Sequence, residues 1–369
     1  MGATATVRVM SSEEIAARAG GETAFLHWPQ RATLFAEREM RLRQLAVGHA
    51  MGDFLLFLAG VVHAQHEQLQ TFGQQFPSLP LPDNAALDRA ARAGLPPLPA
   101  SDWPRDPAWQ TSLRAIAAAV RAQAPAPAQA VLQALTEADG DWLERQADCL
   151  LTGVMAGLDL ASAPIVAAAL QVYWTHLLLQ VQTHHGAKGQ PVGRIDDETA
   201  CPCCGSRPTS SITRSSGESL GQRYLHCSLC SLQWHMVRIK CPHCLSGKKL
   251  AYFSLDTHDA LEVADAGPTH GDEASDEAQP VHSRAASAVI QAETCDDCGH
   301  YLKIMHSDRN AFVDPVADDL ASITLDLLVA DTGKLRHGVN LMLLFGESDA
   351  AEPSHPPDRA DPPPDPGAA

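Results

Sequence analysis

The spacing of apolar residues predicts that the first half of the chain is helical. Between residues 30 and 185, apolar side chains recur every three or four positions, the period of a helix with one buried face. Pro107, Pro127 and Pro164 stand at the starts of such runs, where proline suits a first helical turn. The predicted helices cover residues 34–45, 54–69, 107–123, 127–138, 140–157 and 163–182. We therefore predict a helical domain over residues 30–185, with a long proline-rich connection at 73–106.

One of these helices is apolar enough to raise the question of a membrane span. The run over residues 165–181 is interrupted by two glutamines and a histidine, so we predict a buried core helix rather than a transmembrane one. Residues 1–20 contain no apolar stretch of the kind found in a secretory signal. We therefore expect a cytoplasmic protein without stable membrane association, in which residues 1–29 form a flexible N-terminus.

Beyond residue 185 the helical period ends and the pattern changes. We expect a glycine-containing linker over residues 186–199, and then a region, residues 200–304, in which short strand-like runs alternate with cysteine pairs. Residues 256–282 contain eight acidic residues and no lysine or arginine, which predicts a flexible acidic loop. Strands are predicted at 222–227, 234–239 and 250–255. A C-terminal helical segment is predicted over 305–347, and within it a helix at 316–328 whose apolar face contains Leu320, Ile323, Leu327 and Leu328. We expect a disordered proline-rich tail at 348–369.

The candidate chemistry of the chain lies in its cysteine pairs. Eight of the ten cysteines form four Cys-x-x-Cys motifs. Two residues between cysteines let a tight turn direct both sulfurs at one ion, and two such turns complete a tetrahedron. In a reducing compartment this spacing indicates metal binding rather than disulfides. The candidate metal ligands are Cys201, Cys204, Cys227, Cys230, Cys241, Cys244, Cys295 and Cys298. We predict two metal ions per chain, each held by four cysteines.

The order of the motifs allows two ways to assemble these sites. The intervals between successive motifs are 22, 10 and 50 residues. We favour sequential assembly, the first motif with the second and the third with the fourth, because a hairpin can span the first interval and the acidic loop lies within the longest. Interleaved assembly, as in cross-braced zinc folds, stays open. A site made only of sulfur suits either iron or zinc, and the string CPCCG at Cys201 resembles the knuckles of both rubredoxins and zinc ribbons.

These features together predict an α+β protein: an N-terminal helical bundle, two rubredoxin- or zinc-ribbon-like four-cysteine modules, and a C-terminal helical segment. Small β-rich modules have too little core to fold alone, so metal binding would supply part of their folding free energy. We interpret Cys203, inside the first motif, as a bystander, while roles as a substitute ligand or a reactive thiol stay open. We interpret His226, His235 and His243 as neighbours of the sulfurs rather than ligands, because the sulfur count is already complete.

Charge is distributed unevenly along the chain. The formal net charge is −17, which disfavours nucleic acid or an anionic membrane as the partner. Residues 201–250 nevertheless contain seven lysines and arginines and a single acidic residue. Part of this excess would offset the thiolates, since four of them around a divalent ion leave a charge of about −2. The other interpretation is a docking face for an acidic protein surface, with Arg223, Arg238 and Lys240 as the candidate residues.

Several runs of sequence resemble the family of the formate dehydrogenase accessory protein FdhE. The strings RYLHCSLC and WHMVRIKC begin at Arg223 and Trp234, and ETCDDC, YLK and ADDLAS begin at Glu293, Tyr301 and Ala317. The resemblance is most specific in the region that contains these strings, and the helical part fits the family in layout. The extra cysteine in the first motif, the long acidic loop and the proline-rich tail depart from the family pattern.

The resemblance implies a cytoplasmic, chaperone-like assembly factor that binds the catalytic subunit of a formate dehydrogenase before export and carries rubredoxin-like iron sites. We also expect that the protein is not an enzyme. Consistent with this, a site closed by four sulfurs leaves no open coordination position, and the chain lacks a Walker A motif and an H-E-x-x-H motif. Two other classes of function stay open: a rubredoxin-like electron carrier or redox sensor, and a zinc-ribbon nucleic-acid-binding protein.

Overall fold

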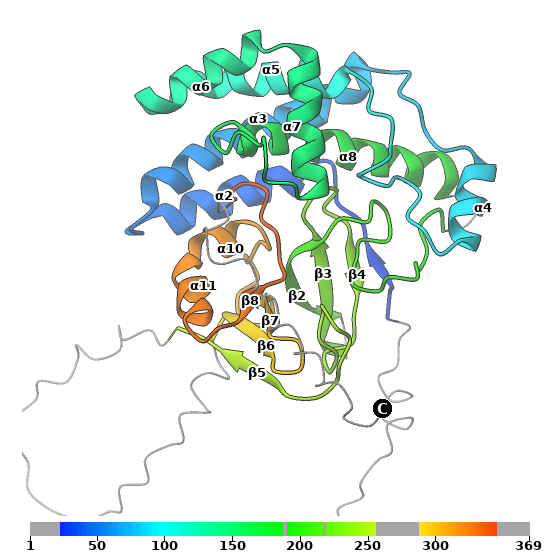
Figure 1. Cartoon of the computed structure of the whole chain (residues 1–369), viewed down its shortest axis with the longest axis vertical. Helices are drawn as coiled ribbons and strands as arrows, with labels where there is room; N and C mark the ends of the chain where they lie inside the picture. Colours follow the sequence, from blue (N-terminus) through cyan, green and yellow to red (C-terminus); the bar gives the residue numbers. More distant parts are fainter. Residues whose placement is uncertain (1–22, 187–189, 217–218, 256–287, 345–369) are drawn as a thin grey trace, which may run out of the picture.

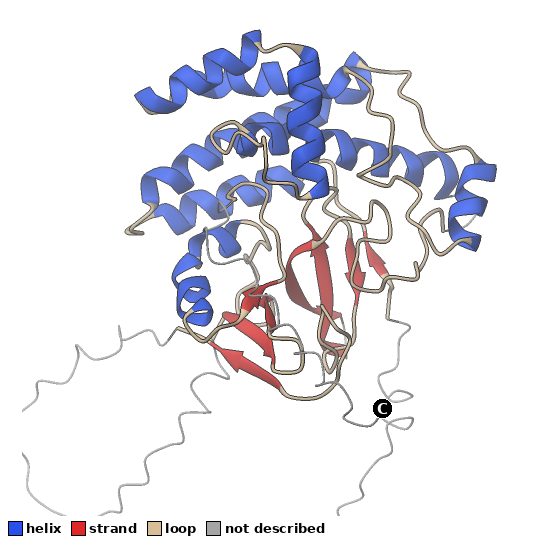
Figure 2. Ribbon diagram, viewed as in Figure 1, coloured by secondary structure: helices blue, strands red, loops and turns tan. Residues whose placement is uncertain are grey.

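The computed structural model describes residues 23–186, 190–216, 219–255 and 288–344, and within these it contains a helical half and a half built on one sheet (Figures 1 and 2). The acidic loop and the proline-rich tail predicted above lie outside the described residues. The helices are α2 (Leu34–Ala46), α3 (Gly52–Gln75), α4 (Asn84–Arg92), α5 (Ala108–Arg121), α6 (Ala126–Glu137), α7 (Gly140–Thr152), α8 (Ala163–His185), α10 (Ala317–Ala321) and α11 (Ile323–Ala330). The strands are β1 (Leu26–His27), β2 (Pro208–Ser216), β3 (Ser219–Cys227), β4 (Gln233–His235), β5 (Leu250–Phe253), β6 (Ile290–Cys295), β7 (His300–His306) and β8 (Leu335–Arg336).

The helical half forms where the apolar period predicts it. Helix α7 is capped at its start by Asp139, whose carboxylate accepts hydrogen bonds from two first-turn N–H groups, and at its end by Gly153, which has a φ of 74°. Helix α4 lies inside the segment predicted to be a connection, because Asp83 caps a short run of good helix formers there.

Helix α8 forms the centre of the molecule. It is buried on all faces over most of its length, as its continuous apolar sequence predicts. By length and composition alone it could cross a membrane, but 89% of its most apolar window is buried inside the fold. Figure 1 shows α8 running across the helical half directly above the ends of β3 and β4. The prediction of a buried core helix over residues 165–181 is confirmed.

The sheet joins both cysteine modules into one structure. Its strand order is β1-β4-β3-β2-β7-β6-β5, and β8 pairs with β7 outside this path. Strands β2, β3 and β4 are antiparallel neighbours, as are β5, β6 and β7. The two sets meet through the parallel pairing of β2 with β7, in which Ser211 lies opposite Ile304. Strand β1, within the segment predicted to be flexible, adds to the edge by pairing with β4.

The C-terminal helical segment is interrupted at Ser322, which changes its apolar face. A single helix over residues 316–328 was the expectation, but α10 ends and α11 begins at Ser322, with φ −112° and ψ 32°. Leu327 and Leu328 are therefore 60% and 51% exposed, while Leu325 and Val329 face the core. Of the predicted apolar face, Leu320 is buried and Ile323 half-buried, and the prediction is wrong at Leu327 and Leu328.

The hydrophobic core is continuous between the two halves. One buried cluster includes the apolar residues of α3, α5 and α8, the four cysteines of the first module, and Leu341 and Met342 near the end of the described chain. The helical bundle therefore does not have a core of its own. The first cysteine module is part of the same packed interior.

Candidate metal centres

All four Cys-x-x-Cys motifs form the same tight turn, which we call a knuckle. The residue after the second cysteine has a left-handed backbone in each knuckle, with φ of 74° at Gly205, 60° at Ser231, 62° at Leu245 and 72° at Gly299. In three knuckles the N–H of this residue donates to the carbonyl of the first cysteine, at 2.8 Å for Gly205, 3.0 Å for Leu245 and 2.9 Å for Gly299. The turn is thereby closed, with the two cysteines of each motif brought into one cluster.

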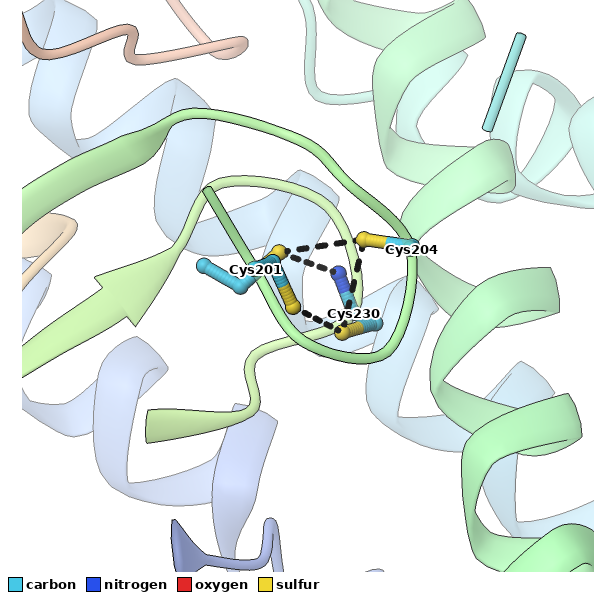
Figure 3. A group of neighbouring side chains, drawn as sticks. Cys201, Cys204 and Cys230 are labelled. Atoms are coloured by element: carbon cyan, nitrogen blue, oxygen red, sulfur yellow. Dashed lines mark hydrogen bonds between the residues drawn. The ribbon is translucent and has the colours of Figure 1, made fainter. Parts of the chain in front are cut away.

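The first cluster contains Cys201, Cys204, Cys227 and Cys230. Figure 3 shows Cys201 and Cys204 on one knuckle and Cys230 on the other, with their sulfurs converging. The sulfurs of Cys201 and Cys230 are 3.6 Å apart, those of Cys204 and Cys227 3.4 Å, and those of Cys204 and Cys230 3.7 Å. Four sulfurs bound to zinc at about 2.3 Å would lie about 3.8 Å from one another. The cluster therefore has the dimensions of a tetrahedral metal site.

Hydrogen-bond donors surround the sulfurs of this cluster. The N–H groups of Leu229 and Cys230 each lie 3.4 Å from Cys227 Sγ. Donors of this kind stabilise the thiolate form that a metal requires. These donors thus fit a metal bound by four thiolates. Because the first cluster combines the first and second motifs, the predicted sequential assembly is confirmed.

The helical half holds the first cluster from two sides. In α8, Gln171 Nε2 donates to Ser228 O at 2.8 Å, and Thr175 Oγ1 donates to Cys230 O at 3.4 Å. In the connection before α5, the N–H of Leu98 donates to Cys203 O at 2.9 Å. Polar side chains inside a helix that is otherwise apolar therefore anchor the knuckles, and all four sulfurs are fully buried.

The second cluster contains Cys241, Cys244, Cys295 and Cys298 and lies nearer the solvent. The sulfurs of Cys241 and Cys298 are 3.8 Å apart, as are those of Cys244 and Cys295, which again matches a tetrahedral site. Cys244 is exposed and Cys298 is half-buried. The N–H of His243 lies 3.4 Å from Cys241 Sγ. The two clusters thus share one ligand arrangement but differ in their access to water.

The remaining cysteines stand apart from these ligand sets. Cys203 is fully buried beside the first cluster but is not one of its four converging sulfurs. A hydrogen bond to Cys230 acts to lower the pKa of Cys203, but burial and the neighbouring thiols raise that pKa on balance. Cys149 is half-buried in α7. Cys203 is therefore held as a neutral thiol within the core, which agrees with a bystander.

The histidines beside the motifs have different surroundings. His226 is buried and bonds to Arg38 at 3.4 Å and to Gln233 at 3.2 Å, and burial followed by the charge of Arg38 lowers its pKa to about 3. The ring of His235 packs edge-on against Tyr224. Neither histidine belongs to a group of converging ligand atoms in the described chain. His243 does belong to such a group, which also contains Cys298 and His300.

The three basic residues predicted to contact a partner lie in different environments. Arg223 is fully buried, so a direct contact between Arg223 and a partner is contradicted. Its guanidinium pairs with Glu293 and donates to Val237 O at 2.7 Å and to Lys240 O at 2.5 Å. Arg238 is exposed, and Lys240 is partly exposed with its Nζ 3.3 Å from Glu198.

A buried ionic network beside the sheet was not predicted. Lys303 Nζ lies 3.0 Å from Asp319 and 2.6 Å from Asp326, and Arg336 also contacts Asp319 at 2.7 Å. Two further ion pairs, formed by Arg38 with Asp314 and by Arg41 with Asp318, tie α2 to the C-terminal segment. The signal in the sequence was the pair of aspartates within the apolar run at 316–328. These groups stabilise the fold around the clusters.

One sequence match to an enzyme motif has the wrong structural context. Residues 217–221 read G-x-S-x-G, the spacing of a hydrolase nucleophile elbow. That motif requires a turn from a strand into a helix. Here Ser219 and Gly221 lie in strand β3, which pairs antiparallel with β2, and no helix follows the serine. The match therefore does not indicate a serine hydrolase.

Comparison with protein families gives three matches along the chain. Residues 23–189 match the family model described as FdhE, N-terminal, residues 200–238 match FdhE, central domain, and residues 274–343 match FdhE, C-terminal domain. The first cluster lies within the central match. Of the second cluster, Cys295 and Cys298 lie within the C-terminal match.

Individual relatives agree with these models. The Protein FdhE homolog of Pseudomonas aeruginosa is 40% identical over 321 residues, covering 87% of this chain and 93% of the relative. Protein FdhE of Escherichia coli is 33% identical over 347 residues, covering 93% of this chain and 100% of the relative. The crystal structure of the FdhE protein from Pseudomonas aeruginosa superposes with a TM-score of 0.72 and 38% identity, over 88% of this chain and 100% of that one. The chain therefore belongs to the FdhE family.

Proposed function

We propose that this protein is a cytoplasmic accessory factor that binds the catalytic subunit of a formate dehydrogenase during its assembly, without itself being an enzyme. Family membership over most of the chain is the observation that carries the proposal. Two four-sulfur clusters support it further, because complete sulfur coordination serves folding or electron transfer rather than hydrolysis.

Each cluster would hold one metal ion, giving two per chain. Cys201, Cys204, Cys227 and Cys230 would bind the first ion, and Cys241, Cys244, Cys295 and Cys298 the second. Iron and zinc both suit a tetrahedron of thiolates. A bound ion would cross-link two knuckles and supply folding free energy to strands that are short. Metal analysis together with native mass spectrometry of freshly purified protein is expected to give two ions per chain.

We place the contact with the client at residues 237–240, which we call the basic tip. Val237 and Ile239 are 43% and 73% exposed, and they alternate with Arg238 and Lys240. Apolar side chains exposed among basic ones suit an acidic surface with an apolar centre. The backbone of the tip is held from inside by Arg223, which itself pairs with Glu293. The tip is therefore rigid before any partner binds, which lowers the entropy cost of binding.

Replacing Arg238→Glu tests this contact. We expect both metals and the thermal stability to be retained and client affinity to fall about tenfold or more, because opposite charge becomes like charge at the contact. The affinity of the parent protein is expected to weaken as salt rises. Arg121→Glu, at the exposed end of α5, makes the same charge change elsewhere and serves as the control. Unchanged affinity in folded, fully metallated Arg238→Glu protein would remove the basic tip from the interface.

Electron transfer is the second candidate function, and the exposure of the second cluster favours it. Cys244 and Cys298 reach the solvent, so an iron ion there would lie close to the surface, as electron exchange with a partner requires. A redox titration of iron-loaded protein measures this. A reversible one-electron signal from the second cluster that turns over with the client would support the electron carrier, and its absence would leave the clusters structural.

A further inference from the structure

Three histidine rings pack together against the second cluster. The rings of His243 and His300 are stacked with centroids 3.8 Å apart and planes 10° from parallel. His337 meets His243 edge-on, with centroids 4.9 Å apart. All three rings line one small hollow together with Cys241 and Cys295. Three imidazoles at one place beside a sulfur cluster exceed what a hydrophobic core requires.

Two nitrogens of these rings have no hydrogen-bond partner in the described part of the chain. His243 Nδ1 and His337 Nε2 are buried and make no hydrogen bond in the described part of the chain, and His337 is only 6% exposed. His300 Nδ1 lies 2.8 Å from Cys298 O. Because a carbonyl only accepts, this nitrogen carries the ring proton, and the lone pair of a neutral His300 is on Nε2. Metal-binding histidines are oriented in the same way.

The sulfur of Cys298 completes a set of converging ligand atoms. One ring nitrogen of His243, one of His300 and Cys298 Sγ all lie within 4.8 Å of one another. Cys298 is half-buried, less enclosed than the cysteines of the first cluster. A thiolate has more than one lone pair and can bridge two cations. Four thiolates around a divalent ion leave about −2 of charge, which attracts a second cation to this edge.

We propose that His243, His300 and Cys298 form an additional metal site that shares the Cys298 thiolate with the second cluster. Nitrogen and sulfur donors select a borderline or soft divalent ion such as Zn²⁺ or Co²⁺. Three protein ligands leave one coordination position for water or for a donor atom of a bound client. An ion lies in the plane of each imidazole that binds it, so the stacked rings of His243 and His300 would have to turn relative to one another when the ion binds. The inference rests on the proposed function only in that the second cluster must hold its own ion.

The site predicts a third ion in protein whose two clusters are already filled. Zinc-loaded protein is titrated with Co²⁺, and native mass spectrometry counts both ions by their different masses. We expect two zinc ions and one cobalt ion per chain. In His300→Phe, which keeps an aromatic ring on His243 but removes the nitrogens, cobalt affinity is expected to fall at least about tenfold with both zinc ions retained. His243→Ala is expected to act in the same way.

The control is His63→Ala, which removes an exposed histidine of α3 that contacts Glu39. Cobalt binding that falls equally in His63→Ala would show unspecific surface binding and overturn the inference. It is also overturned if parent protein with two zinc ions takes up no cobalt, or if His300→Phe binds it unchanged. Loss of zinc from the second cluster in both histidine variants would likewise overturn it, because the histidines would then only support the cysteines. Fewer than two zinc ions in the parent would instead count against the metal content in the proposed function.

Discussion

In each cysteine knuckle the residue after the second cysteine has a left-handed backbone conformation, although this residue is glycine in only two of the four knuckles. Ser231 and Leu245 adopt the same conformation with φ of 60° and 62°. A side chain in this region costs about 1–2 kcal/mol, so it persists only where the surroundings enforce it. Convergence of four sulfurs enforces it here. The knuckle is therefore set by the cluster as well as by local sequence, and glycine relieves a strain that the other two knuckles retain.

Adding a methyl group at Gly299 tests this view of the knuckle. Gly299 has a φ of 72°, and a Cβ there would meet no atom within 4 Å, so the cost is purely conformational. We expect Gly299→Ala to destabilise the second cluster by about 1 kcal/mol and to speed the release of its ion to a chelator. Gly193→Ala, where φ is not positive and a Cβ also meets nothing, is the matched control. Equal release rates in both variants would contradict the argument.

A buried neutral histidine makes stability depend on pH. Burial, and then the charge of Arg31, lower the pKa of His176 to about 4, against 6.5 for an ordinary histidine. As the pH falls below 6.5 the unfolded chain takes up a proton that the folded protein refuses. Stability present above pH 6.5 is thus lost towards pH 4, by about 1.4 kcal/mol per unit.

Replacing His176→Gln is expected to remove this loss while keeping a polar side chain near Arg31. Between pH 7 and pH 5, the variant's free energy of unfolding is predicted to fall by about 2 kcal/mol less than that of the parent. Chemical denaturation at several pH values measures the difference. His184→Gln, at an exposed position in the last turn of α8, controls for loss of a histidine. Parallel pH profiles for parent and His176→Gln would show that the site does not control the acid response.

At the scale of elements, the sequence predicted helices better than strands, for a physical reason. The long helices bury apolar residues at regular spacing, and α8 is apolar on all faces. Strand β2 was not predicted because its buried side chains are largely hydroxyls rather than hydrocarbons. Ser210 Oγ donates to Pro315 O at 2.8 Å, and Thr213 Oγ1 donates to Asp308 at 2.7 Å. Polar residues with partners far along the chain give no local hydrophobic pattern.

The break between α10 and α11 has a similar origin. Lys303, on β7, is buried, and its Nζ donates to Asp319 O at 2.7 Å and Ser322 O at 3.4 Å. The same carbonyls accept backbone hydrogen bonds only from residues three positions on, Ser322 and Leu325, and the Ser322 hydroxyl donates back to Asp318 O at 2.7 Å. A lysine from a distant strand therefore helps to end α10 at Ser322, and that contribution is not visible in the local sequence.

Replacing Lys303→Met is predicted to destabilise the protein by about 3–5 kcal/mol, because it leaves two buried carboxylates short of one cation. Asp319 and Asp326 would then share Arg336 alone. Thermal and denaturant unfolding measure the loss. Lys334→Met, which removes a lysine paired with Asp296 at the surface, is the control and is expected to change stability much less. Comparable losses in the two variants would mean that the buried network contributes no more than a surface pair.

For the candidate centres, spacing alone predicted which eight cysteines converge and their sequential assembly into two clusters. A Cys-x-x-Cys turn is a local feature, so sequence is sufficient to recognise it. The role of Arg223 was not accessible in this way. Its position between Glu293 and the carbonyls of the basic tip depends on strand pairing across the sheet. The contribution of His300 and His337 beside the second cluster likewise depends on long-range packing.

For the whole molecule, the two clusters differ in how much of the fold depends on them. The first belongs to the hydrophobic core that also contains the centres of α3, α5 and α8. The second cluster lies beside strands β5 and β6, since Cys295 is the last residue of β6, and its Cys244 is exposed. Residues 30–185 and 200–304, which the sequence suggests as separate domains, are thus joined through the first cluster. We propose that the helical half and the first cluster unfold as one cooperative unit.

Two matched substitutions test this proposal. Cys204→Ser removes a buried sulfur from the first cluster, and Cys244→Ser removes an exposed sulfur from the second. Each variant is expected to lose one metal ion. In Cys204→Ser we expect amide hydrogens of α8 to exchange faster together with those of β3, because Gln171 and Thr175 anchor the knuckle to that helix. In Cys244→Ser faster exchange should be confined to β5 and β6. Hydrogen exchange with mass spectrometry resolves these segments, and full protection of α8 in Cys204→Ser would establish the helical half as an independent domain.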